Sequence, residues 1–266
     1  MSLASDNSIV LSADNLQVGY GSYVLMRDVS FSVSKGDIFF IMGGSGCGKS
    51  TLLHVLMGLK PPQKGEIFFG DVNFWDGSEN TRRQCMRHAG VLFQSGALWS
   101  SMTLAENVGL PLQQYTDLQD DEIADLASLK LSLVGLAGFE DYYPSEISGG
   151  MSKRAGLARA LALDPQILFL DEPSAGLDPV SSNLLDELIK ELRDSLGATF
   201  VIVSHELASI FNIGTNSIFL DVNTRTVTAR GNPLKLAQDA ATQKDALMFL
   251  TRGTGTPLTG AKGNMA

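Results

Sequence analysis

Cysteines, long apolar runs and basic charge are all scarce in this sequence of 266 residues. The two cysteines, Cys47 and Cys85, are too few for a disulfide framework and indicate a reducing compartment. No stretch reaches the ~20 apolar residues that a membrane-spanning helix needs. The first ten residues also lack the basic start and apolar run of a signal peptide. We therefore expect any membrane role to come through a partner.

Charge and composition narrow the class of protein further. A formal net charge of −9 argues against a broad nucleic-acid surface, because phosphate backbones are bound by patches of Lys and Arg. Hydrophobic residues make up 44% and charged residues 18%, which is typical of a globular chain. The length is sufficient for one large domain or two small ones. These values predict a folded protein that does not bind nucleic acid.

Apolar strand patterns alternate with helical patterns along most of the chain, which predicts an α/β fold with a largely parallel core sheet. The first strands alternate more and predict an antiparallel edge layer. The expected strands are 9–18, 37–42, 65–69, 90–93, 167–171, 199–204 and 217–221. The expected helices are 48–59, 120–134, 151–163 and 179–196.

The region between Gln94 and Pro165 has an almost entirely helical pattern. We interpret it as a helical subdomain, about 95–164, inserted between two parts of an α/β core at about 9–94 and 165–235. Together these parts form one predicted domain over residues 1–253. The remaining residues, 254–266, are rich in Gly and Thr and predict a flexible tail.

One segment matches the phosphate-binding pattern G-x-x-x-x-G-K-[ST] in full: Gly43, Gly44, Ser45, Gly46, Cys47, Gly48, Lys49 and Ser50. A buried strand precedes it and a helix that begins at Thr51 follows it. In such a loop the backbone N–H groups and the helix N-terminus bind phosphate oxygens. Lys49 would neutralise β/γ-phosphate charge and Ser50 would bind Mg²⁺. The alternative is a glycine-rich turn before a helix.

Cys47 occupies a position that the phosphate-binding pattern leaves free. Two interpretations are open: a redox role, or a small residue tolerated beside phosphate.

Two further segments carry candidate chemistry. Asp171 ends an apolar strand, where we expect it to bind Mg²⁺, and Glu172 follows it and would polarise the attacking water. The alternative is an ordinary turn with two acids. Ser148, Gly149 and Gly150 open a helical pattern, so their hydroxyl and N–H groups could bind a phosphate. By itself this triplet is only a turn signal.

The block from Ile147 to Pro173, ISGGMSKRAGLARALALDPQILFLDEP, and the phosphate loop together resemble the ATP-binding subunits of ABC transporters. The resemblance covers nearly everything from Val10 to Gly231. It implies a P-loop NTPase (RecA-like) core, ATP and Mg²⁺ as cofactors, and ATP hydrolysis. It also implies a head-to-tail homodimer in which the signature, Ser148 to Met151, closes on the ATP of the partner subunit. Asp171 and Glu172 would then act on the ATP bound in cis.

The same resemblance implies roles for four single residues. Tyr20 resembles the aromatic residue that stacks on adenine, with a core tyrosine as the alternative. Gln94 resembles the loop glutamine that contacts Mg²⁺ and the membrane partner. Asp178, in the segment Ala175–Asp178, resembles the residue that links the two sites across the dimer. His205 resembles the switch histidine at the γ-phosphate, with a structural histidine as the alternative.

Met151 stands where the family signature usually has Gln, and it cannot make the hydrogen bonds of an amide. The same Met occurs in the ATPases of Mla-type lipid transport, which work with MCE-domain proteins. The segments Leu92–Val108 and Gly109–Ile123 also resemble that group, although Gln113, Gln114 and Tyr115 depart from its pattern. The resemblance implies phospholipid transport with a transmembrane permease and an MCE-domain partner. It places the chain at the cytoplasmic face of the bacterial inner membrane.

Two other functions remain open at this point: a non-transport ABC ATPase that acts as a regulatory or assembly switch, and an importer ATPase for a small solute. For a transporter, the partner's coupling helix would dock in the region Gln94–Tyr143. The apolar residues Leu98, Trp99, Met102 and Leu104 either line that cleft or pack inside the helical subdomain.

Overall fold

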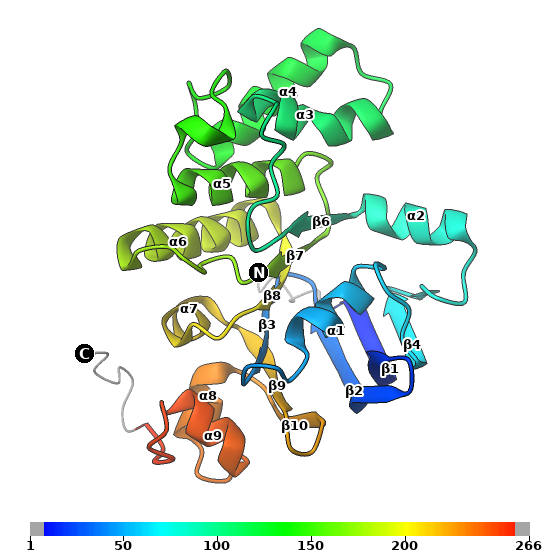
Figure 1. The fold of residues 1–266 in the computed structure, drawn as a ribbon, viewed down its shortest axis with the longest axis vertical. Coiled ribbons are helices and arrows are strands. Elements are labelled where there is room, and N and C mark those ends of the chain that lie inside the picture. Colours follow the sequence, from blue (N-terminus) through cyan, green and yellow to red (C-terminus); the bar gives the residue numbers. More distant parts are fainter. Residues whose placement is uncertain (1–7, 259–266) are drawn as a thin grey trace, which may run out of the picture. The chain divides into compact units, whose positions relative to one another are not determined.

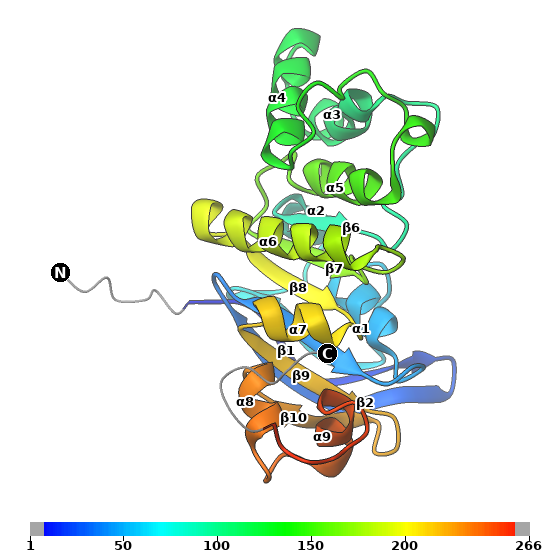
Figure 2. The same ribbon diagram turned by 90° about the vertical axis from the view of Figure 1, so that its left-hand side faces the viewer.

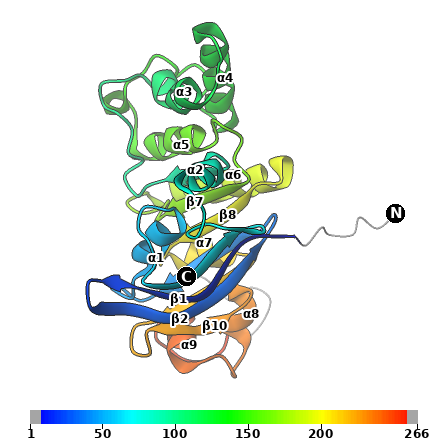
Figure 3. The ribbon, with the colours of Figure 1, turned by 90° about the vertical axis from the view of Figure 1, so that its right-hand side faces the viewer.

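The computed structural model describes residues 8–258. Residues 1–7 and 259–266 lie outside the described part, as do most of the segment compared with a signal peptide and the end of the predicted tail. The chain forms two compact units. Unit 1 comprises residues 1–75 and 203–266, and unit 2 comprises residues 76–202. Their elements are shown in Figures 1, 2 and 3.

Unit 1 begins with an antiparallel sheet whose strand order is β2-β1-β4-β5. Strands β1 and β2 form a long hairpin that turns between Tyr20 and Tyr23 (blue in Figure 3). This sheet confirms the antiparallel edge layer that the alternating sequence pattern predicted. Its strands are β1 (Ile9–Tyr20), β2 (Tyr23–Ser34), β4 (Lys64–Phe69) and β5 (Val72–Asn73).

A second group of strands in unit 1 has the order β10-β9-β3. Strands β3 and β9 are parallel, and all six residues of β3 are buried. Two short helices lie beside β9 and β10 (orange to red in Figure 2). The elements are β3 (Ile38–Gly43), α1 (Lys49–Leu56), α7 (Leu207–Ile213), β9 (Asn216–Asp221), β10 (Thr226–Arg230), α8 (Pro233–Gln238) and α9 (Lys244–Leu250).

Unit 2 combines strands in the order β8-β7-β6 with a group of helices in which α3, α4 and α5 pack on one another (Figure 1). Strands β6 and β7 are parallel, and β7 is buried along its whole length. The elements are α2 (Glu79–Arg87), β6 (Ala89–Leu92), α3 (Leu104–Tyr115), α4 (Asp120–Leu133), a short 3₁₀ turn (Pro144–Glu146), α5 (Gly149–Ala160), β7 (Ile167–Asp171), α6 (Pro179–Leu196) and β8 (Thr199–Val203).

The predicted α/β architecture is confirmed, and the helix predicted at 179–196 has those bounds. The sequence-based prediction missed β2, in which only Val29–Ser34 alternates regularly, because the exposed pair Arg27 and Asp28 interrupts the alternation of buried residues before it. It also missed α2, none of whose residues is buried, and α7, β10, α8 and α9 after His205, whereas the strand predicted at 217–221 is β9. Among the described residues, no helix is long and apolar enough to cross a membrane. The single-domain boundaries at 1–253 stay a prediction.

Candidate functional site

The phosphate loop lies in unit 1, between the end of β3 and the start of α1. Two of its glycines have a positive φ, 154° at Gly43 and 99° at Gly48, which side-chain-bearing residues rarely adopt. A Cβ on Gly43 would also lie 2.6 Å from the Leu220 carbonyl oxygen. A Cβ on Gly48 would lie 2.6 Å from Leu25 Cδ2, at the end of a movable side chain. Sterics and backbone angle therefore both favour glycine at position 43, and the backbone angle favours it at position 48.

Lys49 is the first residue of α1, and its side chain folds back over the loop. Its Nζ donates hydrogen bonds to the carbonyl oxygens of Gly43 at 2.9 Å and Gly44 at 3.0 Å. The side chain is buried, whereas Ser45, Gly46 and Ser50 are exposed. No side chain caps the N-terminus of α1. An anion at this end would meet backbone N–H groups, the helix dipole and one ammonium, which suits a phosphate.

Cys47 points inward from the phosphate loop and is almost fully buried. A Cβ on Gly43 would lie 2.6 Å from the Cys47 Sγ, so this sulfur fills the inner side of the turn. Burial raises the pKa of the Cys47 thiol above its ordinary value, although the nearby Lys49 acts in the opposite direction. The thiol is therefore the favoured form at neutral pH, which supports a packing role over a redox role.

Tyr20 ends β1 with 57% of its surface exposed, so the alternative that it is a core tyrosine is wrong. Its hydroxyl lies 3.4 Å from Thr51 Oγ1 in α1, which links the aromatic ring to the helix after the phosphate loop. The Nζ of Lys60 lies 3.3 Å from the centre of the ring and donates to the Gly19 carbonyl. Lys60 is a neighbour that the sequence patterns did not identify.

His205 also belongs to unit 1 and is exposed. It lies two residues after β8 and two before α7. Hydrogen bonds of the adjacent residues Ser204 and Glu206 fix the conformation of this connection. The backbone N–H of Glu206 donates to the buried Ser204 hydroxyl at 3.0 Å, and the Glu206 carboxylate caps α7. The exposed ring and the hydrogen-bonded turn give the histidine a defined, accessible position.

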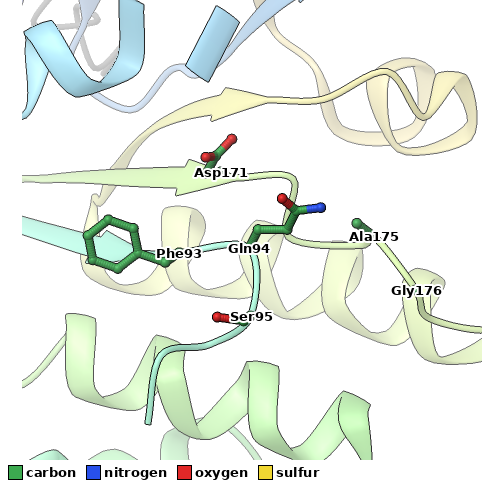
Figure 4. Close-up of a pocket in the computed structure, with 6 residues that line it drawn as sticks. All are labelled: Phe93, Gln94, Ser95, Asp171, Ala175 and Gly176. Atoms are coloured by element: carbon green, nitrogen blue, oxygen red, sulfur yellow. The ribbon is translucent and has the colours of Figure 1, made fainter. Parts of the chain in front are cut away.

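In unit 2, Gln94 and Asp171 border the same cavity (Figure 4). Asp171 is the last residue of β7, and Gln94 follows the parallel neighbour β6 by two residues. The cavity has a volume of about 530 Å³ and is also lined by Phe93, Ser95, Ala175 and Gly176. Parallel strands thus bring an amide and a carboxylate to one edge of the strands β6 and β7.

Glu172 follows Asp171 with a positive φ of 47°, a conformation that non-glycine residues rarely adopt. Its carbonyl oxygen accepts hydrogen bonds from the Ala175 N–H at 3.1 Å and from Lys153 Nζ at 3.4 Å. Asp171 is buried and Glu172 is half-buried. Backbone strain of this kind concentrates at functional sites, where the surrounding structure maintains it.

The signature turn opens α5, with Ser148 as the N-cap. The Ser148 hydroxyl accepts a hydrogen bond from the Met151 N–H at 3.2 Å. Ser148 and Gly149 are exposed, and Met151 is half-buried. The helix predicted to begin at Met151 therefore begins two residues earlier, because Gly149 and Gly150 form its first turn after the N-cap Ser148. This accessible helix N-terminus can accept an anion.

Asp178 caps α6 in a similar way. Its carboxylate accepts hydrogen bonds from the Val180 and Ser181 N–H groups, each at 3.0 Å, and from the Ser181 hydroxyl at 2.5 Å. These bonds, the Ser181 hydroxyl first, lower the pKa of Asp178 below its ordinary value. Asp178 is thus a fixed and exposed carboxylate, two residues after Gly176, which lines the cavity.

Two cations on α5 contact the loop after Gln94, and sequence reasoning identified neither. Lys153 is buried and donates to the Gln94 carbonyl oxygen. Arg159 donates to the carbonyl oxygens of Gly96 at 2.9 Å and Ala97 at 2.8 Å. Both cations bind backbone carbonyl oxygens, which every residue type has, so the sequence does not show the contacts. The one available signal was that Lys153 lies within the signature block.

The apolar residues expected at the helical subdomain divide into two groups. Leu104 is fully buried in unit 2, so it packs internally and lines no open cleft. Trp99 has 59% of its surface exposed, on a loop that the buried Asn107 holds through four hydrogen bonds. Leu98 and Met102 are half-buried. An exposed indole on an ordered loop is compatible with a docking surface.

A magnesium site can be built from a cluster of acidic side chains or from separate oxygen donors. Within residues 8–258, no group of three or more His, Cys, Asp or Glu side chains could hold a metal ion. Mg²⁺ commonly binds through one or two protein oxygens together with substrate phosphates and water. The oxygens of Ser50, Gln94 and Asp171 are donors of the right kind for that mode.

The fold and the phosphate loop define a P-loop nucleotide-binding protein. Comparison with protein families gives a match to the ABC transporter family over residues 26–175. The chain is 37% identical to the intermembrane phospholipid transport system ATP-binding protein MlaF of Haemophilus influenzae, over 87% of each chain. The chain belongs to the ABC transporter family.

Two other similarities accompany this assignment. The chain is 42% identical to the probable ribonucleotide transport ATP-binding protein mkl of Mycobacterium tuberculosis, over 75% of this chain. It spans about half (55%) of the length of that relative. Among solved structures, the ATP-binding cassette MJ0796, a dimer in a post-hydrolysis state bound to ADP and phosphate, matches with a TM-score of 0.75 and 28% identity. That match covers 84% of this chain and 98% of that chain.

Proposed function

We propose that this chain powers phospholipid transport between or across membranes, as the ATPase subunit of a transporter. The similarity to MlaF carries the proposal, because it extends over 87% of both chains. Met151 in the signature supports it, as does Trp99 exposed on an ordered loop. The partners would be a transmembrane permease and an MCE-domain protein, with the chain bound peripherally at the cytoplasmic face of the bacterial inner membrane.

Each unit contributes distinct residues to this proposed ATPase. In unit 1, Lys49 and the N–H groups of the loop bind the phosphates, Tyr20 stacks on adenine, and His205 contacts the γ-phosphate. Ser50 would bind Mg²⁺, which neutralises phosphate charge when it is bound. The N–H groups from Gly44 to Gly48 lie between the end of β3 and the start of α1, which suits the extended anion.

In unit 2, Glu172 accepts a proton from the attacking water, and Gln94 and Asp171 would hold Mg²⁺. Gln94 and Asp171 line the same cavity, which supports a shared role in binding Mg²⁺. The signature residues 148–151 would bind the ATP of a second copy, and Asp178 would connect the two sites. The dimeric state of the related cassette MJ0796 supports a homodimer here.

The name of the mycobacterial relative favours a second candidate, transport of a small solute such as a ribonucleotide. Affinity purification from native membranes separates the two. The Glu172→Gln variant is used beside the wild type, because slow hydrolysis should trap the assembled complex. We expect a multi-span permease, an MCE-domain protein and bound phospholipid. A solute-binding protein with bound ribonucleotide, or a soluble assembly partner, would contradict phospholipid transport.

A further inference from the structure

Three non-glycine residues in unit 2, all of whose residues 76–202 are described, have positive φ: Ala97 (50°), Asp164 (49°) and Glu172 (47°). Each is contacted by a cation. Arg159 Nη1 donates to the Ala97 carbonyl oxygen at 2.8 Å, and Lys153 Nζ donates to that of Glu172 at 3.4 Å. Lys130 pairs with the Asp164 carboxylate at 2.5 Å. Cations thus accompany all three strained positions of this unit.

One face of α5 holds the loop that follows Gln94. Lys153, Gly156 and Arg159 recur every third residue, so they lie along that face. Gly156 allows close approach, because a Cβ there would lie 3.1 Å from the Gly96 carbonyl oxygen and 3.3 Å from its Cα. Lys153 and Arg159 donate to carbonyl oxygens at either end of the loop. The loop therefore follows the helix that begins with the signature turn.

Lys153 differs from Arg159 because it contacts two segments. Its ammonium donates to the Gln94 and Glu172 carbonyl oxygens, and only 6% of the residue is exposed. Burial lowers its pKa, whereas the charges of Asp171 and Glu172 oppose that shift. One buried cation therefore touches the main chain of Gln94 and Glu172 and lies in the field of both carboxylates.

We propose that Lys153 is a positioning residue for ATP hydrolysis. Its ammonium fixes the main chain of Gln94 relative to that of Glu172, and so sets the directions in which both side chains leave the backbone. Through α5 it also ties these two residues to the signature turn, Ser148–Gly150. The proposal rests on the roles assigned above to Gln94 and Glu172.

The left-handed conformation of Glu172 gives this contact its importance. A non-glycine residue in that region returns to an ordinary conformation unless its surroundings oppose the change. Lys153 and the Ala175 N–H hold the Glu172 carbonyl in place. Without the ammonium, the Glu172 carbonyl loses one of these two hydrogen bonds and the Gln94 carbonyl loses the one from Lys153, so both residues are held less firmly. ATP binding through the phosphate loop is unaffected. The expected defect is therefore in kcat and not in KM.

The test compares Lys153→Met with Lys130→Met in the full chain. Both remove a buried ammonium of unit 2 that supports a left-handed residue, but Lys130 contacts Asp164, outside the proposed site. We measure ATP binding, kcat, KM and hydrogen exchange of the peptide backbone from Phe93 to Trp99. Lys153→Met should lower kcat about 10- to 100-fold at nearly unchanged KM, as displacements near 1 Å do. It should also speed exchange in the loop several-fold.

Lys153→Arg provides the rescue, because it restores a cationic donor and should recover most of the rate and of the loop protection. Lys130→Met should leave kcat and the hydrogen exchange of the loop unchanged. Wild-type kcat and loop exchange in Lys153→Met would overturn the proposal. So would equal losses in Lys153→Met and Lys130→Met, which would indicate general destabilisation. Glu172→Gln is measured in parallel: if it hydrolyses ATP normally, the assignment of Glu172 fails, independently of whether Lys153 holds the loop.

Discussion

Replacing Lys49 with Ala should lower the free energy of unfolding without nucleotide, and should also reduce the additional stabilisation that ATP provides. In the structure the ammonium donates to the carbonyl oxygens of Gly43 and Gly44 and is largely buried. Hydrogen bonds that involve a charged group contribute about 1.5 to 3 kcal/mol each. The exposed Gly44 carbonyl regains water in the variant, which offsets part of the loss. We expect the free energy of unfolding to fall by about 2 kcal/mol without nucleotide.

The second loss comes from linkage between ligand binding and folding. ATP with Mg²⁺ at a hundred times its Kd stabilises the wild type by about 2.7 kcal/mol. If Lys49→Ala weakens binding a hundredfold, the same ATP concentration stabilises the variant by only about 0.4 kcal/mol. The difference between the two proteins should therefore widen from about 2 to about 4 kcal/mol when ATP is added.

Urea denaturation with and without ATP and Mg²⁺ measures both differences. Lys64→Ala is the matched control, since it removes an exposed lysine at the start of β4 in the same unit. It should stay within about 0.5 kcal/mol of the wild type under both conditions. If Lys49→Ala keeps the wild-type stability and ATP protects it equally well, the assignment of the phosphate loop is refuted.

Two further substitutions and one labelling experiment test separate residues. Glu172→Gln should retain ATP binding and slow hydrolysis by about 10²-fold or more; single-turnover assays at the wild-type rate would contradict the proposed water activation. Met151→Gln should change the ATPase rate if the signature position affects phosphate contact, whereas unchanged hydrolysis and lipid transport would make Met151 a lineage marker only. Cys47 should react slowly with maleimide at pH 7, because burial raises its pKa. Its thiolate fraction grows only as pH rises toward that pKa, so mass spectrometry should show labelling that accelerates with pH and slows with ATP.

The parts of the fold predicted from sequence are those with strong local signals. Strands β3 and β7 are continuous apolar runs, and both are fully buried. The helix α6 begins at an Asp-Pro pair and ends at a left-handed Gly197, so its bounds follow from its caps. The strand β2 shows a shorter signal, since only Val29–Ser34 alternates regularly and the exposed pair Arg27 and Asp28 interrupts the pattern before it. Short helices such as α7 contain too few turns to show a period.

The candidate site divides in the same way. The phosphate loop and the Asp171–Glu172 pair could be located because residue type and spacing identify them. Lys60 and Lys153 could not, because each acts on a backbone carbonyl at a distance in the sequence. Lys60 contacts a residue 41 positions away, and Lys153 contacts residues 59 and 19 positions away. Any residue type can offer a backbone carbonyl, so the acceptor in such a contact cannot be identified from the sequence. Only the folded structure shows which residues meet.

Backbone conformation adds information that residue types cannot carry. Glutamate at position 172 suggests a base for water, yet its φ of 47° shows that the chain turns sharply just after β7. That turn begins directly after Asp171, which stays at the strand end and lines the same cavity as Gln94. Two adjacent carboxylates can then serve different atoms, one a metal and the other a water. The division of labour inferred from the sequence therefore depends on a strained residue, and a strained residue needs the hydrogen bonds that Lys153 and Ala175 supply.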